Sequence, residues 1–228
     1  MINPLRKLGL LLLVLPAFAP AQVAKQGDGY LIRVKYKTGD VIRYNMTTSS
    51  KTVGLGSGPS ASVSVPLKVR VVDAKPNRFS LRSSVGPILV NGKPLNGKTS
   101  QTVDSVVDAR GKALSGNAMG FGTAYPEKPV RPGQKWNSSA TVPQLGNSNV
   151  DAIYYFRGIE NRNGLKVAVI DVNISSLAQG TDLRGKGKMV IRVADGTLDR
   201  MSMDLNMIIT PKSGKATSVH TNMLMTRA

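Results

Sequence analysis

The stretch Tyr-Leu-Ile-Arg-Val-Lys-Tyr-Lys (residues 30–37), followed by Thr-Gly-Asp (38–40) and Val-Ile-Arg-Tyr-Asn-Met (41–46), decides the fold class. Apolar and basic side chains alternate along its first part, and a period of two is typical of a strand with one buried face. The Thr-Gly-Asp tripeptide is typical of a turn. The stretch therefore predicts two strands joined by a turn, with these side chains on the buried side: Ile32, Val34, Tyr36, Ile42, Tyr44 and Met46.

The same alternation recurs along the chain, in residues 41–53, 67–72, 78–85, 150–158, 165–175, 189–194, 198–210 and 216–227. Asn-Gly and Asp-Gly dipeptides separate several of these segments, and such dipeptides favour tight hairpin turns. We expect no long helix after the first 21 residues. The pattern predicts an antiparallel all-β fold, and it fits either a β-sandwich or a partly open barrel.

The first 21 residues have the three parts of a cleavable secretory signal peptide, and we expect them to form a signal-peptide helix. Arg6 and Lys7 supply positive charge, residues 8–15 form an apolar run, and small residues at 19 and 21 predict cleavage before Gln22. The run is too short to cross about 30 Å of hydrocarbon. We therefore expect an exported bacterial protein, periplasmic or extracellular, with one domain over residues 22–228 and no transmembrane segment after cleavage.

The chain has no cysteine, 31 Lys and Arg residues and 13 Asp and Glu residues, which gives a net charge of +18. The lack of cysteine excludes disulfides, Cys-ligated zinc, iron–sulfur clusters and thiol nucleophiles. The positive charge favours solubility and anionic partners, and it carries no information about the fold.

A proline-rich connector, residues 125–132, separates two halves that resemble each other, 30–124 and 133–228. Gly39 and Asp40 in the first half are echoed by Gly133 and Gln134 in the second, and both halves reach an acidic turn that contains glycine. The likeness predicts an internal duplication. The general similarity of any two antiparallel sheets is the alternative explanation.

The segment Tyr-Pro-Glu-Lys-Pro-Val-Arg-Pro-Gly-Gln-Lys-Trp (residues 125–136) resembles a Pro-x-Lys-Pro-Val-x-x-Gly-Asp-x-Trp segment. That segment belongs to a family of exported, β-rich bacterial proteins to which no activity is assigned. Tyr36, Gly39 and Asp40 are similar to the Tyr-x-x-Gly-Asp pattern at the start of those proteins. Gln134 stands where the family has an acid. The resemblance implies export and a β-rich fold, and it implies no chemistry.

Residues 92–99 (Gly-Lys-Pro-Leu-Asn-Gly-Lys-Thr) match the phosphate-loop pattern, in which Lys98 would neutralise phosphates at the start of a helix. The residues that follow are modest or poor helix formers, so we interpret the match as two successive Asn-Gly turns. His220 is the only histidine, and no nucleophile-elbow pattern accompanies it. We therefore expect no serine-type triad and no enzyme activity.

Methionines recur near the C-terminus, and a hairpin turn at residues 210–215 would place Met203 opposite Met223 and Met201 opposite Met225. Thioethers with His220 nearby have the ligand chemistry of a Cu(I) site. The alternative, which we favour, is a methionine-lined apolar face that packs in the interior. We expect no metal and no cofactor.

Basic side chains of the N-terminal half share the outward parity of their strands and have few acidic neighbours. They are Arg33, Lys35, Lys37, Arg43, Lys68, Arg70, Arg78 and Arg82. We predict that they form a cationic face that binds an anionic lipid or a cell-envelope polymer, and a merely solvated charged surface is the alternative. Nucleic acid is not expected, because aromatic residues are not interleaved with these basic residues.

These observations favour an exported, non-enzymatic β protein that binds or scaffolds through its basic face. The alternative is a carrier of an apolar ligand or lipid in a cavity between sheets. A carrier requires a large apolar cavity, whereas a surface-binding module requires a filled core. The sequence leaves the ligand and the oligomeric state open.

Overall fold

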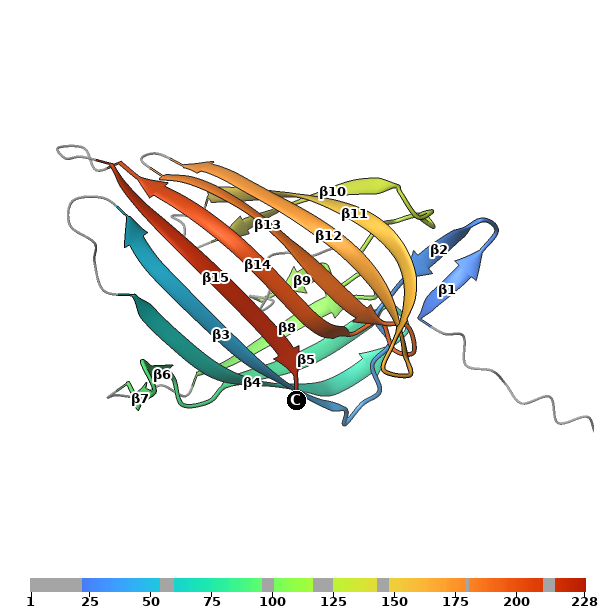
Figure 1. Ribbon diagram of the computed structural model, residues 1–228. Helices are drawn as coiled ribbons and strands as arrows, with labels where there is room; N and C mark the ends of the chain where they lie inside the picture. Colours follow the sequence, from blue (N-terminus) through green and yellow to red (C-terminus); the bar gives the residue numbers. More distant parts are fainter. Residues whose placement is uncertain are drawn as a thin grey trace, which may run out of the picture.

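The computed structural model (Figure 1) describes residues 22–53, 60–95, 101–116, 125–142, 148–178, 181–210 and 216–228. All named elements within these ranges are β-strands. A helix long and apolar enough to cross a membrane is not found in the described part of the chain. The expected signal peptide, residues 1–21, lies outside the described residues and stays a prediction.

The strands fall on both sides of the proline-rich connector. Before it lie β1 (Val23–Gln26), β2 (Gly29–Ile32), β3 (Val41–Val53), β4 (Ala61–Lys75), β5 (Arg78–Val85), β6 (Leu89–Val90), β7 (Lys93–Pro94), β8 (Thr102–Asp108) and β9 (Ala113–Ser115). After it lie β10 (Lys135–Val142), β11 (Ser148–Arg162), β12 (Leu165–Ala178), β13 (Thr181–Arg192), β14 (Leu198–Ile209) and β15 (Thr217–Arg227).

Thirteen of these strands form a single antiparallel sheet in the order β10-β11-β12-β13-β14-β15-β3-β4-β5-β8-β9, with the β6–β7 hairpin attached to β4. The sheet curls, so that β10 to β14 face β4, β5 and β8 across its interior (Figure 1). Its edge strands β10 and β9 do not pair with each other, so the sheet is not closed. The antiparallel all-β prediction is confirmed, and one unclosed curved sheet corresponds to the partly open alternative.

Several predicted strands coincide with observed ones. Residues 41–53 and 78–85 are β3 and β5 without any shift. The sequence prediction missed residues 181–188 of β13, because Gly-Lys-Gly-Lys at 185–188 has low strand propensity. In the sheet, side chains of β14 occupy the space next to these two glycines of β13. A Cβ on Gly185 would clash with Leu205, and a Cβ on Gly187 would clash with Met203.

The prediction of one strand over residues 30–37 is wrong beyond Ile32, although its parity is right, since Ile32 and Val34 are both buried. Residues 33–37 leave the strand and cross the end of the large sheet. The Val34 N–H donates to the Ala109 carbonyl and the Lys35 N–H to the Asp195 carbonyl, just beyond β8 and β13. An extended segment can thus alternate between buried and exposed side chains, as a strand does, and yet pair with no neighbouring strand. Its backbone hydrogen bonds go instead to residues at strand ends and in turns.

Two turns have the same geometry in the two halves of the chain. Gly39 and Gly133 both have a left-handed φ, +91° and +90°. In each turn the glycine N–H donates to a strand carbonyl, and the next side chain accepts from the backbone N–H three residues earlier. These bonds are Gly39 to Val71 (2.9 Å), Gly133 to Phe156 (2.8 Å), Lys37 to Asp40 (2.7 Å) and Arg131 to Gln134 (2.8 Å). Gln134 thus accepts in its turn the same backbone hydrogen bond that Asp40 accepts in the first. The duplication stays a prediction, which this match favours.

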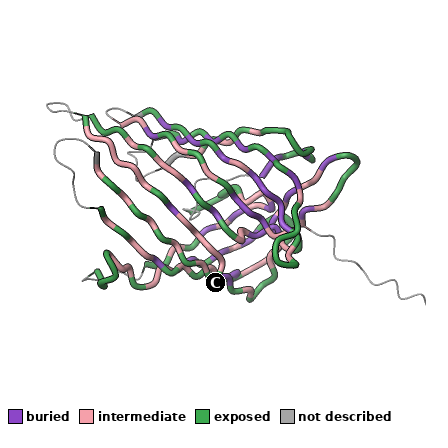
Figure 2. The backbone as a smooth tube through the Cα atoms, viewed as in Figure 1, coloured by how far each residue is buried: buried purple, intermediate pink, exposed green. Residues whose placement is uncertain are grey.

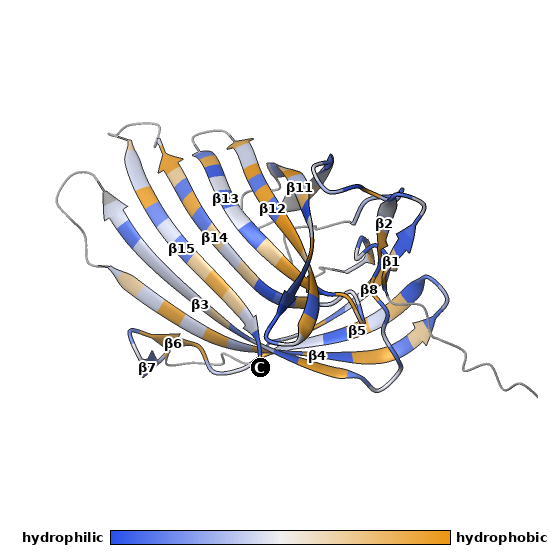
Figure 3. Cartoon of the chain, turned by 45° about the vertical axis from the view of Figure 1, so that its right-hand side comes forward, coloured by the Kyte–Doolittle hydropathy of each residue, from blue (hydrophilic) through white to orange (hydrophobic). Residues whose placement is uncertain are grey.

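The main core lies on the concave face of the sheet, the face that carries Leu81, Tyr154, Ile170 and Met201. Val167, Val169 and Val190, of the other parity, form a smaller buried cluster. Apolar and polar residues alternate along the strands that form this face (Figure 3). Buried residues concentrate at the end of the sheet near β1 and β2 (Figure 2). We call this the closed end, because residues 33–37 and 125–130 cross the sheet there; the open end is the opposite one, where β14 ends.

Candidate functional site: the apolar cavity at the closed end

A cavity of about 180 Å³ lies on the concave face near the closed end. Strands from both sides of the curled sheet line it, together with the crossing segment at residues 33–37. Aliphatic and thioether side chains supply most of the wall, among them Leu67, Leu81, Met189, Met201 and Met225. The period-two alternation of each strand produces this surface, because every second side chain points inward.

The predicted methionine register is confirmed: Met203 is opposite Met223 and Met201 is opposite Met225. Met201, Met203 and Met223 are buried in the core. His220 has the other parity on β15, and its Nδ1 lies 3.5 Å from the Asp204 carboxylate on the outer face. The histidine and the thioethers therefore lie on opposite faces of the sheet, so they do not form one metal site.

Hydroxyl groups are the polar component of the cavity wall. Tyr36, Tyr44, Tyr125, Ser83 and Ser105 all line it. Burial raises the pKa of Tyr36 to about 12, and it also raises the pKa of Tyr44 and of Tyr125. The phenols are therefore neutral at physiological pH, and the cavity presents neutral hydroxyls on an apolar wall.

Tyr125 seals the cavity at the closed end. It is buried, and its hydroxyl donates to the Gly196 carbonyl at 2.9 Å. Tyr154 provides a contrast: its ring stacks on Trp136 with 5.1 Å between centroids, and its buried hydroxyl has no partner among the described residues.

This contrast gives a testable pair of substitutions. Tyr125→Phe is expected to lower the free energy of unfolding by about 1–2 kcal/mol, because the Gly196 carbonyl loses its donor. Tyr154→Phe is expected to be neutral or stabilising by up to about 1 kcal/mol, because it removes a buried hydroxyl that makes no bond. Urea unfolding of both variants measures the difference, and equal losses would contradict this interpretation of the two hydroxyls.

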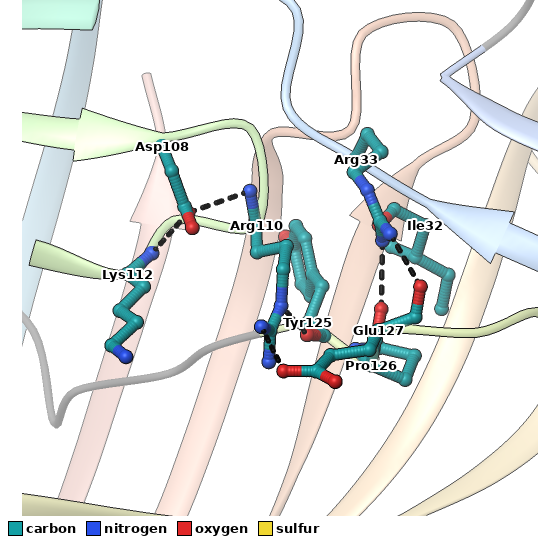
Figure 4. Close-up of polar contacts among 8 residues, drawn as sticks. All are labelled: Ile32, Arg33, Asp108, Arg110, Lys112, Tyr125, Pro126 and Glu127. Carbon is teal, nitrogen blue, oxygen red and sulfur yellow. Dashed lines mark hydrogen bonds and ion pairs between the residues drawn. The ribbon is translucent and has the colours of Figure 1, made fainter. Parts of the chain in front are cut away.

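Arg33 is one of the predicted basic-face residues, and its guanidinium points to the backbone of Pro126 and Glu127 (Figure 4). Its guanidinium donates to the carbonyls of Ile32 (2.6 Å), Pro126 (2.7 Å) and Glu127 (2.7 Å). Burial, together with the nearby Arg110 charge, lowers its pKa. Arg33 thus ties the two crossing segments together.

Five of the other predicted basic residues share the outer face of β3, β4 and β5: Arg43, Lys68, Arg70, Arg78 and Arg82. We call this set the outer basic face. Arg43 is directly opposite Lys68, and Arg70 is directly opposite Arg82. Arg82 also forms a two-bond pair with Asp104, at 2.8 and 3.0 Å. Lys35 and Lys37 lie apart from this set at the closed end, so the predicted residues are divided among three places.

The closed end also contains a partly buried ionic cluster, in which Arg227 donates to Asp195 (3.2 Å) and to Thr197 (2.7 Å). Thr197 donates to the Asp195 carboxylate through its hydroxyl (2.6 Å) and its backbone N–H (2.9 Å). Burial alone would raise the pKa of Asp195, and the hydrogen bonds from Thr197 and Arg227 outweigh it and lower that pKa.

A depressed carboxyl pKa has a defined effect on stability. The ionised Asp195 stabilises the fold above the pKa of the unfolded chain, about 3.9, and this contribution is lost as pH falls through the lower folded value. Asp195→Asn is expected to cost about 1–2 kcal/mol at pH 6 and less at pH 3. Urea midpoints at the two pH values measure this, and a constant difference would contradict it.

The first of the two expected Asn-Gly turns is observed, and the second, Asn96-Gly97, lies outside the described residues. Asn91 and Gly92 form the β6–β7 turn, both with positive φ. The next described segment is the strand β8, where the phosphate-loop pattern needs a helix. Lys98 lies outside the described residues.

No protein-family model matches the chain, and no curated protein matches it either. Among solved structures it is similar to lipovitellin, in a structure concerned with the lipid–protein interactions of that protein. The TM-score is 0.52 at 9% identity, over 85% of this chain and 25% of the lipovitellin chain. A second neighbour is a Bacteroides fragilis protein described as exported, with a YmcC-like fold: TM-score 0.41, 12% identity, 86% of this chain and 98% of that one. The chain thus spans a quarter of the lipovitellin chain, with which it shares a fold.

Proposed function

We propose that the protein binds a lipid or another apolar ligand, with hydrocarbon in the cavity at the closed end. The observation that carries this proposal is the 180 Å³ apolar cavity inside an unclosed sheet. A dry apolar cavity of about 150 Å³ is large enough to take up a benzene-sized molecule. The cavity therefore has room for part of a hydrocarbon chain. Lipovitellin, whose solved structure concerns lipid–protein interactions, has a related fold and supports the same proposal.

The concave face offers further apolar surface to a longer ligand. Leu205, Met207 and Val219 point to this face and are only partly buried. Met207 is directly opposite Val219, so the two strands present one apolar strip. The strip runs from the cavity along β14 and β15 to the open end. A ligand longer than the cavity would lie along this strip.

A neutral fluorescent probe tests the proposal. N-phenyl-1-naphthylamine is expected to bind saturably to the purified protein, with a rise in its fluorescence, and 1-octanol is expected to displace it. A neutral probe is needed because an anionic dye would also bind the outer basic face. A fluorescence rise that never saturates, or no rise at all, would refute the proposed function.

The outer basic face supports a second candidate function, binding to an anionic lipid surface or cell-envelope polymer. Like charges directly opposite each other on neighbouring strands are destabilising. Arg43 with Lys68 and Arg70 with Arg82 are two such pairs, and in the second pair Asp104 offsets part of the charge of Arg82. An anionic partner would relieve the repulsion, because it places negative charge between the paired cations.

Substitution of one cation tests this second candidate. Arg70→Glu places opposite charges across β4 and β5, and it is expected to raise stability by about 0.2–1 kcal/mol. It is also expected to lower the salt concentration at which the protein elutes from heparin or from anionic vesicles. Lys25→Glu, with the same change in net charge at an exposed position of β1, is the control. Equal shifts in both variants would mean that only net charge matters.

We also propose that the protein is exported, with residues 1–21 as the leader. N-terminal sequencing of the protein recovered from a bacterial periplasm or medium tests this directly. The proposal requires a mature chain that begins at Gln22.

A further inference from the structure

Two serine hydroxyls in the cavity wall have no hydrogen-bond partner within the described part of the protein. Ser83 is 4% exposed and Ser105 is 5% exposed, and both line the cavity. Neither hydroxyl forms a hydrogen bond with any of the described residues, although both backbones pair within the sheet. Buried hydroxyls normally find a partner, because a donor withdrawn from water without one costs free energy. The two serine oxygens are not among the fully enclosed atoms that lack a partner, so a molecule inside the cavity can reach both and supply the missing bond.

The strand register places the two hydroxyls close together. Ser83 is opposite Val103 and Ser105 is opposite Leu81 on the adjacent strands β5 and β8. The two serines are thus diagonal neighbours on the same face, a relationship that separates residues by about 7–8 Å. One oxygen atom of a ligand located between them can bond to both hydroxyls.

The absence of charged residues from the described cavity wall limits which chemical groups a bound ligand can have. No Asp, Glu, Lys or Arg is among the residues that line the cavity within the described part of the chain. The Tyr36 and Tyr44 hydroxyls, which also line it, stay neutral because burial raises their pKa values. A charged ligand group at this depth would lose its hydration without gaining a counter-ion. An uncharged group loses less hydration, and the serine hydroxyls can replace its hydrogen bonds to water.

We propose that the closed end of the cavity selects a hydrocarbon chain that ends in an uncharged oxygen-bearing group, a hydroxyl or a carbonyl, held by Ser83 and Ser105. This inference rests on the proposed function, since it names the chemical class of the apolar ligand. Sites that hydrogen-bond a ligand oxygen discriminate strongly against analogues without it, because the protein's polar groups are then left unpaired. The same site discriminates against a carboxylate through desolvation.

Three ligands with equal chain length test the inference by displacing N-phenyl-1-naphthylamine at pH 8: 1-octanol, octane and octanoate. We expect 1-octanol to bind about tenfold more tightly than either of the other two. The double variant Ser83→Ala/Ser105→Ala is expected to lose this preference, with octane affinity unchanged or higher. The control is Ser80→Ala/Ser84→Ala, at outward positions of β5, and it is expected to keep the preference.

The outcomes separate this inference from the proposed function. Octane or octanoate binding as tightly as 1-octanol would overturn the inference and leave apolar binding intact. A double variant that weakens all three ligands equally would also overturn it, because the serines would then act only on the shape of the cavity. If the probe does not bind at all, the proposed function itself fails.

Discussion

Gly196→Ala is expected to lower the free energy of unfolding by about 2–5 kcal/mol, the largest stability effect that we predict for a single methyl group. Gly196 has φ +67°, a left-handed conformation that strains any residue with a Cβ. A Cβ at this position would also meet the backbone carbonyl of Arg33. Backbone atoms cannot rotate away as a flexible side chain can. The crossing segment would therefore have to move, and the hydrogen bond from Tyr125 to the Gly196 carbonyl would be disturbed with it.

Gly164→Ala is the matched control. Gly164 also has a left-handed φ, +77°, in the turn between β11 and β12, and nothing lies within 4 Å of its Cβ position. Only the backbone strain remains there, so the expected cost is about 1 kcal/mol. Urea unfolding followed by Trp136 fluorescence measures both variants. Equal losses would show that the close approach to Arg33 contributes nothing.

Ser83→Phe is expected to weaken binding of the neutral probe by about tenfold or more. The ring would occupy the cavity that the ligand needs, and each Å² of apolar surface that the ligand can then no longer bury weakens binding by about 25 cal/mol. The fold is expected to stay within about 1 kcal/mol of the wild-type stability, because the ring fills existing space. The measurement is a probe titration beside an unfolding curve.

Ser84→Phe is the control for this substitution, because it adds the same ring to the next residue of β5. Ser84 points to the outer face, with its hydroxyl 3.5 Å from the Lys68 carbonyl. Probe affinity is expected to be unchanged in this variant. Loss of binding in both variants, or in neither, would contradict the assignment of the site to the concave face.

The sequence predicts the faces of the strands much better than it predicts their partners. Alternation is a local property, and it identified β3 and β5. The opposition of Met203 to Met223 was predicted from the position of a short hairpin turn, which is also local. The same alternation in residues 33–37 led to a wrong strand, because their hydrogen bonds go to Ala109 and Asp195, far away in the chain. Only the complete topology determines such long-range partners.

The site was predictable to a smaller extent. Ser83 has the same buried parity as Phe79 and Leu81 on β5. A polar residue at a buried position of an apolar face is a sequence signal for a binding site, but the basic residues were the more conspicuous signal. The cavity itself depends on how far the sheet curls, which alternation does not encode. The inward turn of Arg33 depends on carbonyls more than 90 positions later in the chain.

The pairing of β15 with β3 has a consequence for biogenesis. It joins the last strand to an early one: the Ser50 and Thr221 hydroxyls lie 2.9 Å apart although 171 positions separate them in the chain. Until β15 is synthesised, β3 and β14 both have an unpaired edge in what becomes the middle of the sheet. Pairings between such distant segments form slowly, because a long loop must close first. A nascent chain of this topology therefore stays incompletely folded until β15 emerges, a property that would suit the export proposed above, because a translocon accepts only unfolded polypeptide.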